Sequence, residues 1–158
     1  MWVPRWYIWS PQQKELEKSK KPPIFPCGTL LTYSSRIIWE GMVDLDIDVI
    51  FNAALHIQLN IEKTISINFS ESGVSIKFPT TRRLAEFLDV PHYYVLPYFA
   101  MMEKDALVTR AERVGIMTTP KGTRKLIELM STCYRRETEL LLGPIVFQEL
   151  VHHALDQL

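Results

Sequence analysis

The chain has 158 residues, of which 47% are hydrophobic and 23% are charged, and its formal net charge is zero. These values are typical of one soluble domain with its own core, and they argue against binding of nucleic acid through overall basic charge. No apolar run approaches the roughly 18 residues of a transmembrane helix, and the N-terminus lacks the apolar segment of a signal peptide. We therefore expect a cytoplasmic protein with no membrane contact.

Residues 1–27 have the composition of an arm. Aromatic residues crowd its start, and a polar stretch that ends in three prolines follows. Such a stretch cannot bury itself, so we expect the aromatic side chains to anchor on the body or on a second subunit. A short helix over 11–20 is compatible with this arm, and residues 28–41 fit either strands or the start of a helix. We assign residues 28–158 to a single domain.

A helix is predicted from Asp44 to Asn60. Its apolar residues recur at three- and four-residue spacing, and they are Ile47, Ile50, Phe51, Ala54, Leu55 and Leu59. Three aspartates lie in its first turn, where the positive end of the helix dipole favours them, and this explains them better than a metal site. The alternating segments TISINF and VSIKF follow, and SESG between them is typical of a hairpin turn.

Two consecutive helices are predicted after Pro79. Thr80 or Thr81 caps the first helix, which ends near Asp89 because the residue before Pro91 is disfavoured in helical conformation. The second helix covers 92–104. Six apolar side chains of this region are expected to form one small core, which leaves the outer face of the second helix exposed; they are Leu84, Leu88, Val95, Phe99, Met102 and Leu107.

Two strands and two helices complete the predicted chain. The strands cover 106–110 and 116–118, with a short loop between them. Thr119-Pro120 begins a long helix that Gly143-Pro144 interrupts, and a last helix covers 145–158. These two helices hold more apolar residues than a small core needs, so we expect an assembly element. The alternative is packing within the chain against the 44–60 helix.

Two cysteines, Cys27 and Cys133, lie far apart in the sequence without zinc-ligand spacing. We therefore expect free thiols rather than a disulfide. The sequence contains no Gly-rich phosphate loop and no recognisable Ser-His-Asp arrangement. His152 and His153 are neighbours on a helix and point in different directions. We expect no enzyme activity, no cofactor and no metal.

The segments TTRRLAEFLDV, PHYYVLPYFAMMEKDALV and TRAERVGIMTTPKGTRKLIELM resemble winged helix-turn-helix transcription regulators of the multiple-antibiotic-resistance, PadR and arsenical-repressor types. The matching pieces are Leu84-Ala85, Leu88, Val90, the strand 107–110 and the segment 119–122. The resemblance covers residues 79–130 only. It implies a mainly α fold with small β content, in which a helix-turn-helix and wing over 79–119 precede C-terminal dimerisation helices over 120–158.

The resemblance also implies a function, namely a regulator that binds duplex DNA as a homodimer through the helix 92–104 and the wing 110–115. The residues expected to contact DNA are Thr80, Thr81, Arg82, Arg83, His92, Tyr93, Tyr94, Arg110, Arg113 and Lys121. The residues expected in the dimer interface are Leu126, Met130, Leu140, Leu141, Phe147 and Val151.

The second helix departs from the resembled pattern on its outer face. The residues expected to project there are His92, Tyr93, Leu96, Pro97 and Ala100, whereas Arg, Asn, Gln and Lys make the bidentate contacts that discriminate bases. An alternative is a winged-helix protein interaction module, in which the apolar helix and the Trp-rich arm bind a partner protein in a larger assembly. A small-molecule sensor with a pocket between the central and terminal helices is compatible with the regulator hypothesis.

Overall fold

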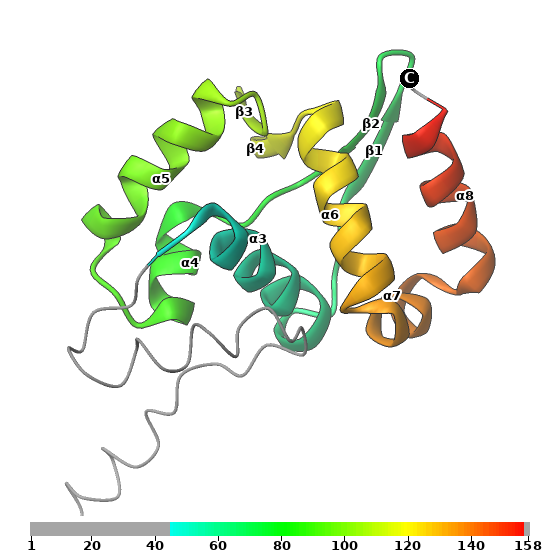
Figure 1. Cartoon of the computed structure of the whole chain (residues 1–158), viewed down its shortest axis with the longest axis horizontal. Helices are drawn as coiled ribbons and strands as arrows, with labels where there is room; N and C mark the ends of the chain where they lie inside the picture. Colours follow the sequence, from blue (N-terminus) through cyan, green and yellow to red (C-terminus); the bar gives the residue numbers. More distant parts are fainter. Residues whose placement is uncertain (1–44, 157–158) are drawn as a thin grey trace, which may run out of the picture.

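The computed structural model describes residues 45–156, so the predictions for the arm 1–27 and for residues 28–41 lie outside the described residues. The prediction of a mainly α fold with a small β component is confirmed (Figure 1). The elements are α3 (Ile47–His56), the π-helix η3 (Ile57–Ile61), β1 (Ile67–Ser70), β2 (Gly73–Ile76), α4 (Thr81–Leu88), α5 (His92–Lys104), β3 (Val108–Ala111), β4 (Gly115–Thr118), α6 (Pro120–Thr132), α7 (Arg135–Leu142) and α8 (Pro144–Leu155).

The central element is α3, which lies between α4 and α6 and packs against both (Figure 1). The Asp46 side chain caps it by accepting a hydrogen bond from the backbone N–H of Ile47, at 2.6 Å. Every residue from Val49 to Leu55 is buried. The predicted helix therefore exists, but it is covered on all sides, whereas the sequence pattern predicted a single apolar stripe.

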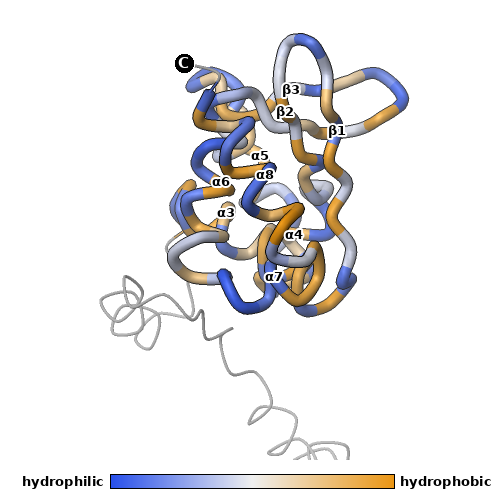
Figure 2. Tube along the Cα trace, turned by 90° about the vertical axis from the view of Figure 1, so that its right-hand side faces the viewer, coloured by the Kyte–Doolittle hydropathy of each residue, from blue (hydrophilic) through white to orange (hydrophobic). Residues whose placement is uncertain are grey.

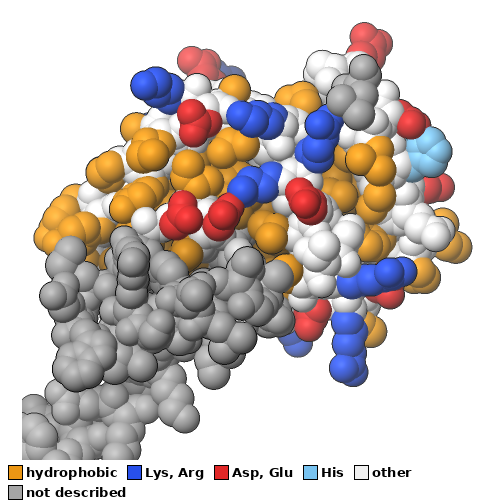
Figure 3. All heavy atoms as spheres, in the orientation of Figure 1, with side chains coloured by type: hydrophobic (Ala, Val, Ile, Leu, Met, Phe, Trp, Pro, Cys, Tyr) orange, Lys and Arg blue, Asp and Glu red, His pale blue; other side chains and the backbone are white. Residues whose placement is uncertain are grey.

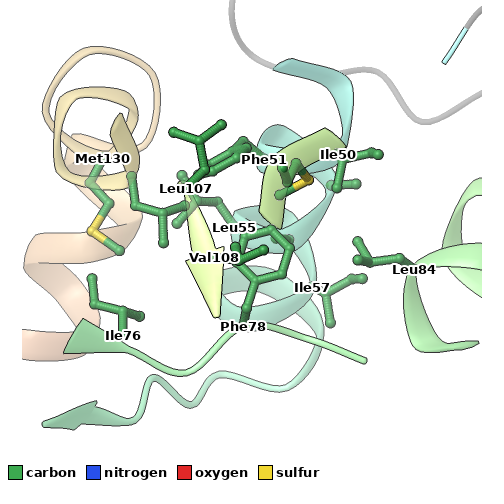
Figure 4. Close-up of a cluster of buried hydrophobic side chains, with 14 of the residues drawn as sticks. Ile50, Phe51, Leu55, Ile57, Ile76, Phe78, Leu84, Leu107, Val108 and Met130 are labelled. Carbon is green, nitrogen blue, oxygen red and sulfur yellow. The ribbon is translucent and has the colours of Figure 1, made fainter. Parts of the chain in front are cut away.

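The predicted core around α4 and α5 is confirmed, because all six of its residues are buried. Phe78, which leads from β2 into α4, joins this core to α3 (Figure 4). Its ring packs edge-on against Phe51, with centroids 5.3 Å apart, and against Phe99, with centroids 5.9 Å apart. The two helices are thereby fixed on one continuous core, and the angle between them is set by buried contacts.

Two antiparallel hairpins lie together at one end of the molecule (Figure 2). The Ile76 N–H donates to Thr118 Oγ1 at 2.8 Å, and a bridge between Lys77 and Met117 continues the contact. Thr118 Oγ1 also lies 2.7 Å from Thr123 Oγ1 on α6. These hydroxyls join β2, β4 and α6. The strand predicted over 106–110 begins two residues later, at Val108.

The prediction of one long helix from Thr119 to Gly143 is wrong, because α6 ends at Thr132 and α7 begins at Arg135. The Tyr134 side chain is fully buried, and its hydroxyl donates to the carbonyl oxygen of Asn52 at 3.3 Å. Burial of this tyrosine against α3 turns the chain where neither glycine nor proline marks a break.

The expectation of a free thiol at Cys133 is also wrong, since Cys133 is disulfide-bonded. Cys27 lies outside the described residues.

The last helix, α8, packs against α6 and β2, while α7 packs against η3. The alternative of packing within the chain therefore holds in part, although α8 covers α6 and β2 instead of the central helix. Residues 45–156 contain no helix with both the length and the apolar character needed to cross a bilayer.

Candidate nucleic-acid interface

A side-chain contact joins the first turns of α4 and α5. Thr81 Oγ1 lies 2.7 Å from His92 Nε2, although the two residues are eleven positions apart. Thr80 caps α4 by accepting from the N–H of Arg83 at 3.2 Å, and α5 begins after Pro91 without a side-chain cap. Because the N-terminal ends of helices present N–H groups and positive partial charge, this junction has the electrostatic character of an anion-binding surface.

The outer face of α5 is apolar and aromatic. Val95, Phe99 and Met102 on the inner face are buried, whereas the exposed residues are His92, Tyr93, Tyr94, Leu96, Pro97, Ala100, Met101 and, at the C-terminal end, Lys104. Hydrophobic side chains gather over α5 in Figure 3. Every residue predicted to project from this helix is exposed, so the face predicted to contact a partner is accessible.

Tyr93 and Tyr94 form an exposed pair at the start of this face. Their rings stack with centroids 4.7 Å apart, and Tyr93 is 64% exposed. Tyr94 raises the pKa of the Tyr93 hydroxyl above its ordinary value of 10.0. The Tyr93 hydroxyl is neutral at neutral pH, where it can both donate and accept hydrogen bonds.

The predicted basic contacts divide into two groups. Arg82 and Arg113 are exposed and form no ion pair within residues 45–156. The others already have partners in the chain. Arg83 Nε lies 3.3 Å from Glu62 Oε1, Arg110 Nε lies 2.6 Å from Glu103 Oε1, and Lys121 Nζ donates to the carbonyl oxygen of Asp105 at 3.1 Å. The two arginine ion pairs are exposed and therefore weak, so a phosphate group can replace the carboxylate in each of them.

The β3–β4 hairpin stands beside the C-terminal end of α5. The Arg110–Glu103 pair connects its first strand to the last turn of α5. At its base, the N–H of Thr119 donates to the carbonyl oxygen of Leu107 at 3.1 Å. Arg113 lies in the turn between the strands and has φ 65°. The hairpin therefore holds a cation at its tip, while its base is attached to both α5 and α6.

Three of the residues predicted for a dimer interface do not reach the surface of the chain. Leu126, Met130 and Phe147 are buried in the core of their own chain. Leu141 and Val151 are half-buried, and Leu140 is 79% exposed. Two exposed apolar residues that the sequence analysis did not single out are Ile145, which is 71% exposed next to the Gly143-Pro144 corner, and Val146 beside it. The Gly143-Pro144 break could have indicated their exposure, since residues beside a sharp turn between helices project from the body of the domain.

Two polar features lie outside this surface. Burial lowers the pKa of His56 below 6.5, while Glu137 opposes the shift. The His56 ring packs on Phe87, with centroids 5.1 Å apart.

A hollow of about 440 Å³ lies between α3 and α6, where a sensor pocket was proposed. Its charged lining is balanced, with three bases and three acids: Lys121, Arg124, Lys125, Asp48, Asp105 and Glu128. The described residues contain no group of three side chains arranged to hold a metal ion.

No family model matches the chain, and no curated protein or solved structure matches it either.

Proposed function

We propose that the protein is a winged helix-turn-helix regulator that binds duplex DNA as a homodimer, with α5 in the major groove and the β3–β4 hairpin as the wing. The observation that carries the proposal is the contact between Thr81 and His92, which brings the starts of two helices to one surface. In helix-turn-helix proteins the second helix enters the major groove, and phosphate contacts fix its position. The exposed outer face of α5 is compatible with that placement.

Two exposed cations beside α5 can contact phosphate groups. Arg82 follows the capped start of α4, and Arg113 lies at the tip of the hairpin. These two cations lie on elements that border α5, as the two phosphate strands border a helix seated in the groove. The zero net charge of the chain does not oppose this, because binding depends on where the basic residues lie.

A homodimer is supported by the exposed apolar residues at the corner between α7 and α8. Leu140, Ile145 and Val146 are all exposed there. A twofold contact through this corner would cover these side chains and join two copies of the chain. Sedimentation velocity tests this part, because Leu140→Asp should convert a dimer into a monomer. A wild-type chain that sediments as a monomer at micromolar concentration would remove dimerisation from the proposal.

The DNA-binding part is tested by fluorescence anisotropy with a labelled duplex of mixed sequence at increasing salt. Affinity should fall steeply with salt, since bound phosphates release counterions. Replacing both Arg82 and Arg113 with Ala should lower the slope of log K against log salt by about 2, at roughly 0.9 for each lost phosphate contact.

The matched control replaces Arg135 and Arg136 with Ala. It also removes two positive charges, but from α7, and both residues are exposed. The proposal predicts that this control keeps the wild-type slope. If both double variants lose the same slope, binding depends on overall charge and the assigned surface is wrong.

A second candidate function is docking of a partner protein on α5. The observation that favours it is the aromatic and apolar outer face, with Tyr93, Tyr94, Leu96 and Met101 exposed. Aromatic residues and Met are enriched in protein interfaces. If the chain does not bind duplex DNA even at low salt, this candidate is favoured over the regulator.

A further inference from the structure

The major-groove surface assigned to α5 lacks the side chains that normally discriminate bases. The helix sequence is HYYVLPYFAMMEK, which contains no Arg, Asn or Gln and has its single Lys at the last position. Bidentate hydrogen bonds to guanine or adenine come from Arg, Lys, Asn and Gln. An α5 helix seated in the groove therefore has no group in its first twelve residues that can make them.

We infer that α5 instead recognises the C5-methyl groups of thymine, so that thymine-rich duplexes are its preferred ligand. This inference rests on the proposed function. In the major groove, the methyl group of thymine is the one apolar feature that the four bases present, and apolar side chains contact it favourably. Leu96, Pro97 and Ala100 are exposed carbon surfaces of suitable chemistry.

The spacing of these residues fits a short run of base pairs. Tyr93, Leu96, Pro97 and Ala100 recur at three- and four-residue intervals, so they share one face of the helix. Seven residues of α-helix rise about 10 Å. Base pairs in B-DNA are about 3.4 Å apart, so this face spans about three of them. A run of consecutive thymines therefore presents methyl groups along the length of the apolar face.

Two cations without an ion pair beside this face favour DNA over an apolar protein as its occupant. Arg82 and Arg113 are exposed without an ion pair within residues 45–156, on the two elements beside α5. The exposed start of α5 adds N–H groups without a side-chain cap. Cations and a helix N-terminus around an apolar strip complement a polyanion with apolar groups in its groove. That description fits thymine-rich duplex DNA.

The decisive experiment compares two duplexes of the same sequence, one with runs of thymine and one with uracil in their place. Uracil lacks only the methyl group, so charge and base pairing are unchanged. Burial of one methyl is worth about a fourfold change in affinity. Two or three methyl contacts therefore predict at least tenfold weaker binding to the uracil duplex, and 5-methylcytosine should strengthen binding when it replaces cytosine.

Protein variants locate the effect. Leu96→Asn should reduce the preference for thymine over uracil, because an amide replaces the apolar contact while the helix stays intact. The matched control is Leu155→Asn on α8, since Leu155 is 52% exposed and Leu96 is 41% exposed. That control should keep the full preference. Circular dichroism of both variants verifies that they are folded.

The outcomes separate the inference from the function on which it rests. Salt-dependent binding with equal affinity for thymine and uracil duplexes overturns methyl recognition and leaves the regulator proposal standing. If Leu96→Asn does not change the preference for thymine, the assignment of methyl recognition to α5 is overturned. No binding to any duplex overturns both, and favours a protein as the partner of this face.

Discussion

Gly122 lies in the first turn of α6, where this helix approaches the chain that leads from α5 into the hairpin. A Cβ atom at this position would lie 1.9 Å from the carbonyl oxygen of Leu107 and 2.8 Å from its carbonyl carbon. The same oxygen accepts the hydrogen bond from Thr119 that closes the base of the hairpin. Replacing Gly122 with Ala therefore forces α6 away from Leu107 and weakens that hydrogen bond.

Two effects of this substitution oppose each other. In a helix, Ala is more favourable than Gly by about 1 kcal/mol. Overpacking costs about 1–3 kcal/mol, and a weakened hydrogen bond adds about 1 kcal/mol. Because the clash is with backbone, which cannot rotate away as a flexible side chain does, the repulsive effect dominates. We expect Gly122→Ala to lower the free energy of unfolding by about 2 kcal/mol.

Urea denaturation followed by far-UV circular dichroism measures this loss. Glu128→Ala, at an exposed position of the same helix, is the control and should change stability by less than about 0.5 kcal/mol. A Gly122→Ala variant as stable as the wild type, or more stable, would show that helix propensity dominates. The close approach of α6 to Leu107 would then be wrong.

Three further predictions address the hydroxyl network, pH and DNA affinity. Thr118→Val leaves the N–H of Ile76 without its acceptor and should lower the free energy of unfolding by about 1–3 kcal/mol in urea titration, whereas Thr118→Ser should not. Burial lowers the pKa of His56 below 6.5, so the unfolded chain takes up a proton at higher pH than the folded chain. Stability should therefore fall as the pH drops below 6.5 through the folded pKa, and His56→Asn should remove that dependence. Glu103→Gln releases Arg110 from its ion pair and should increase affinity for duplex DNA and steepen its salt dependence; unchanged affinity would remove Arg110 from the surface.

Features fixed by local chemistry could be predicted from the sequence. The bounds of α5, His92 to Lys104, match the prediction because Pro91 precedes the helix and the apolar spacing continues through it. The capping role of Thr80 follows in the same way from a hydroxyl placed before an apolar helix face. The exposure of the outer face of α5 also followed from periodicity, since Val95 and Phe99 must turn inward.

Features fixed by distant partners could not be predicted. The break between α6 and α7 depends on burial of Tyr134 against Asn52, which lies far away in the sequence. Arg83 and Arg110 looked like free cations, but Glu62 and Glu103 pair with them only after folding. The apolar residues of α6 and α8 were predicted to exceed what the core needs and so to form an interface. How much of the core they fill depends on how these helices pack, which the sequence alone does not show.

We propose that α5 and the β3–β4 hairpin together form a surface that binds duplex DNA. Amide hydrogen exchange of the full chain, with and without a thymine-rich duplex at low salt, tests it most directly. We expect slower exchange at the start of α5 and in the hairpin, with exchange in η3 unchanged. If DNA leaves exchange in α5 and the hairpin unaltered, or slows exchange only in α7 and α8, the proposed surface is wrong.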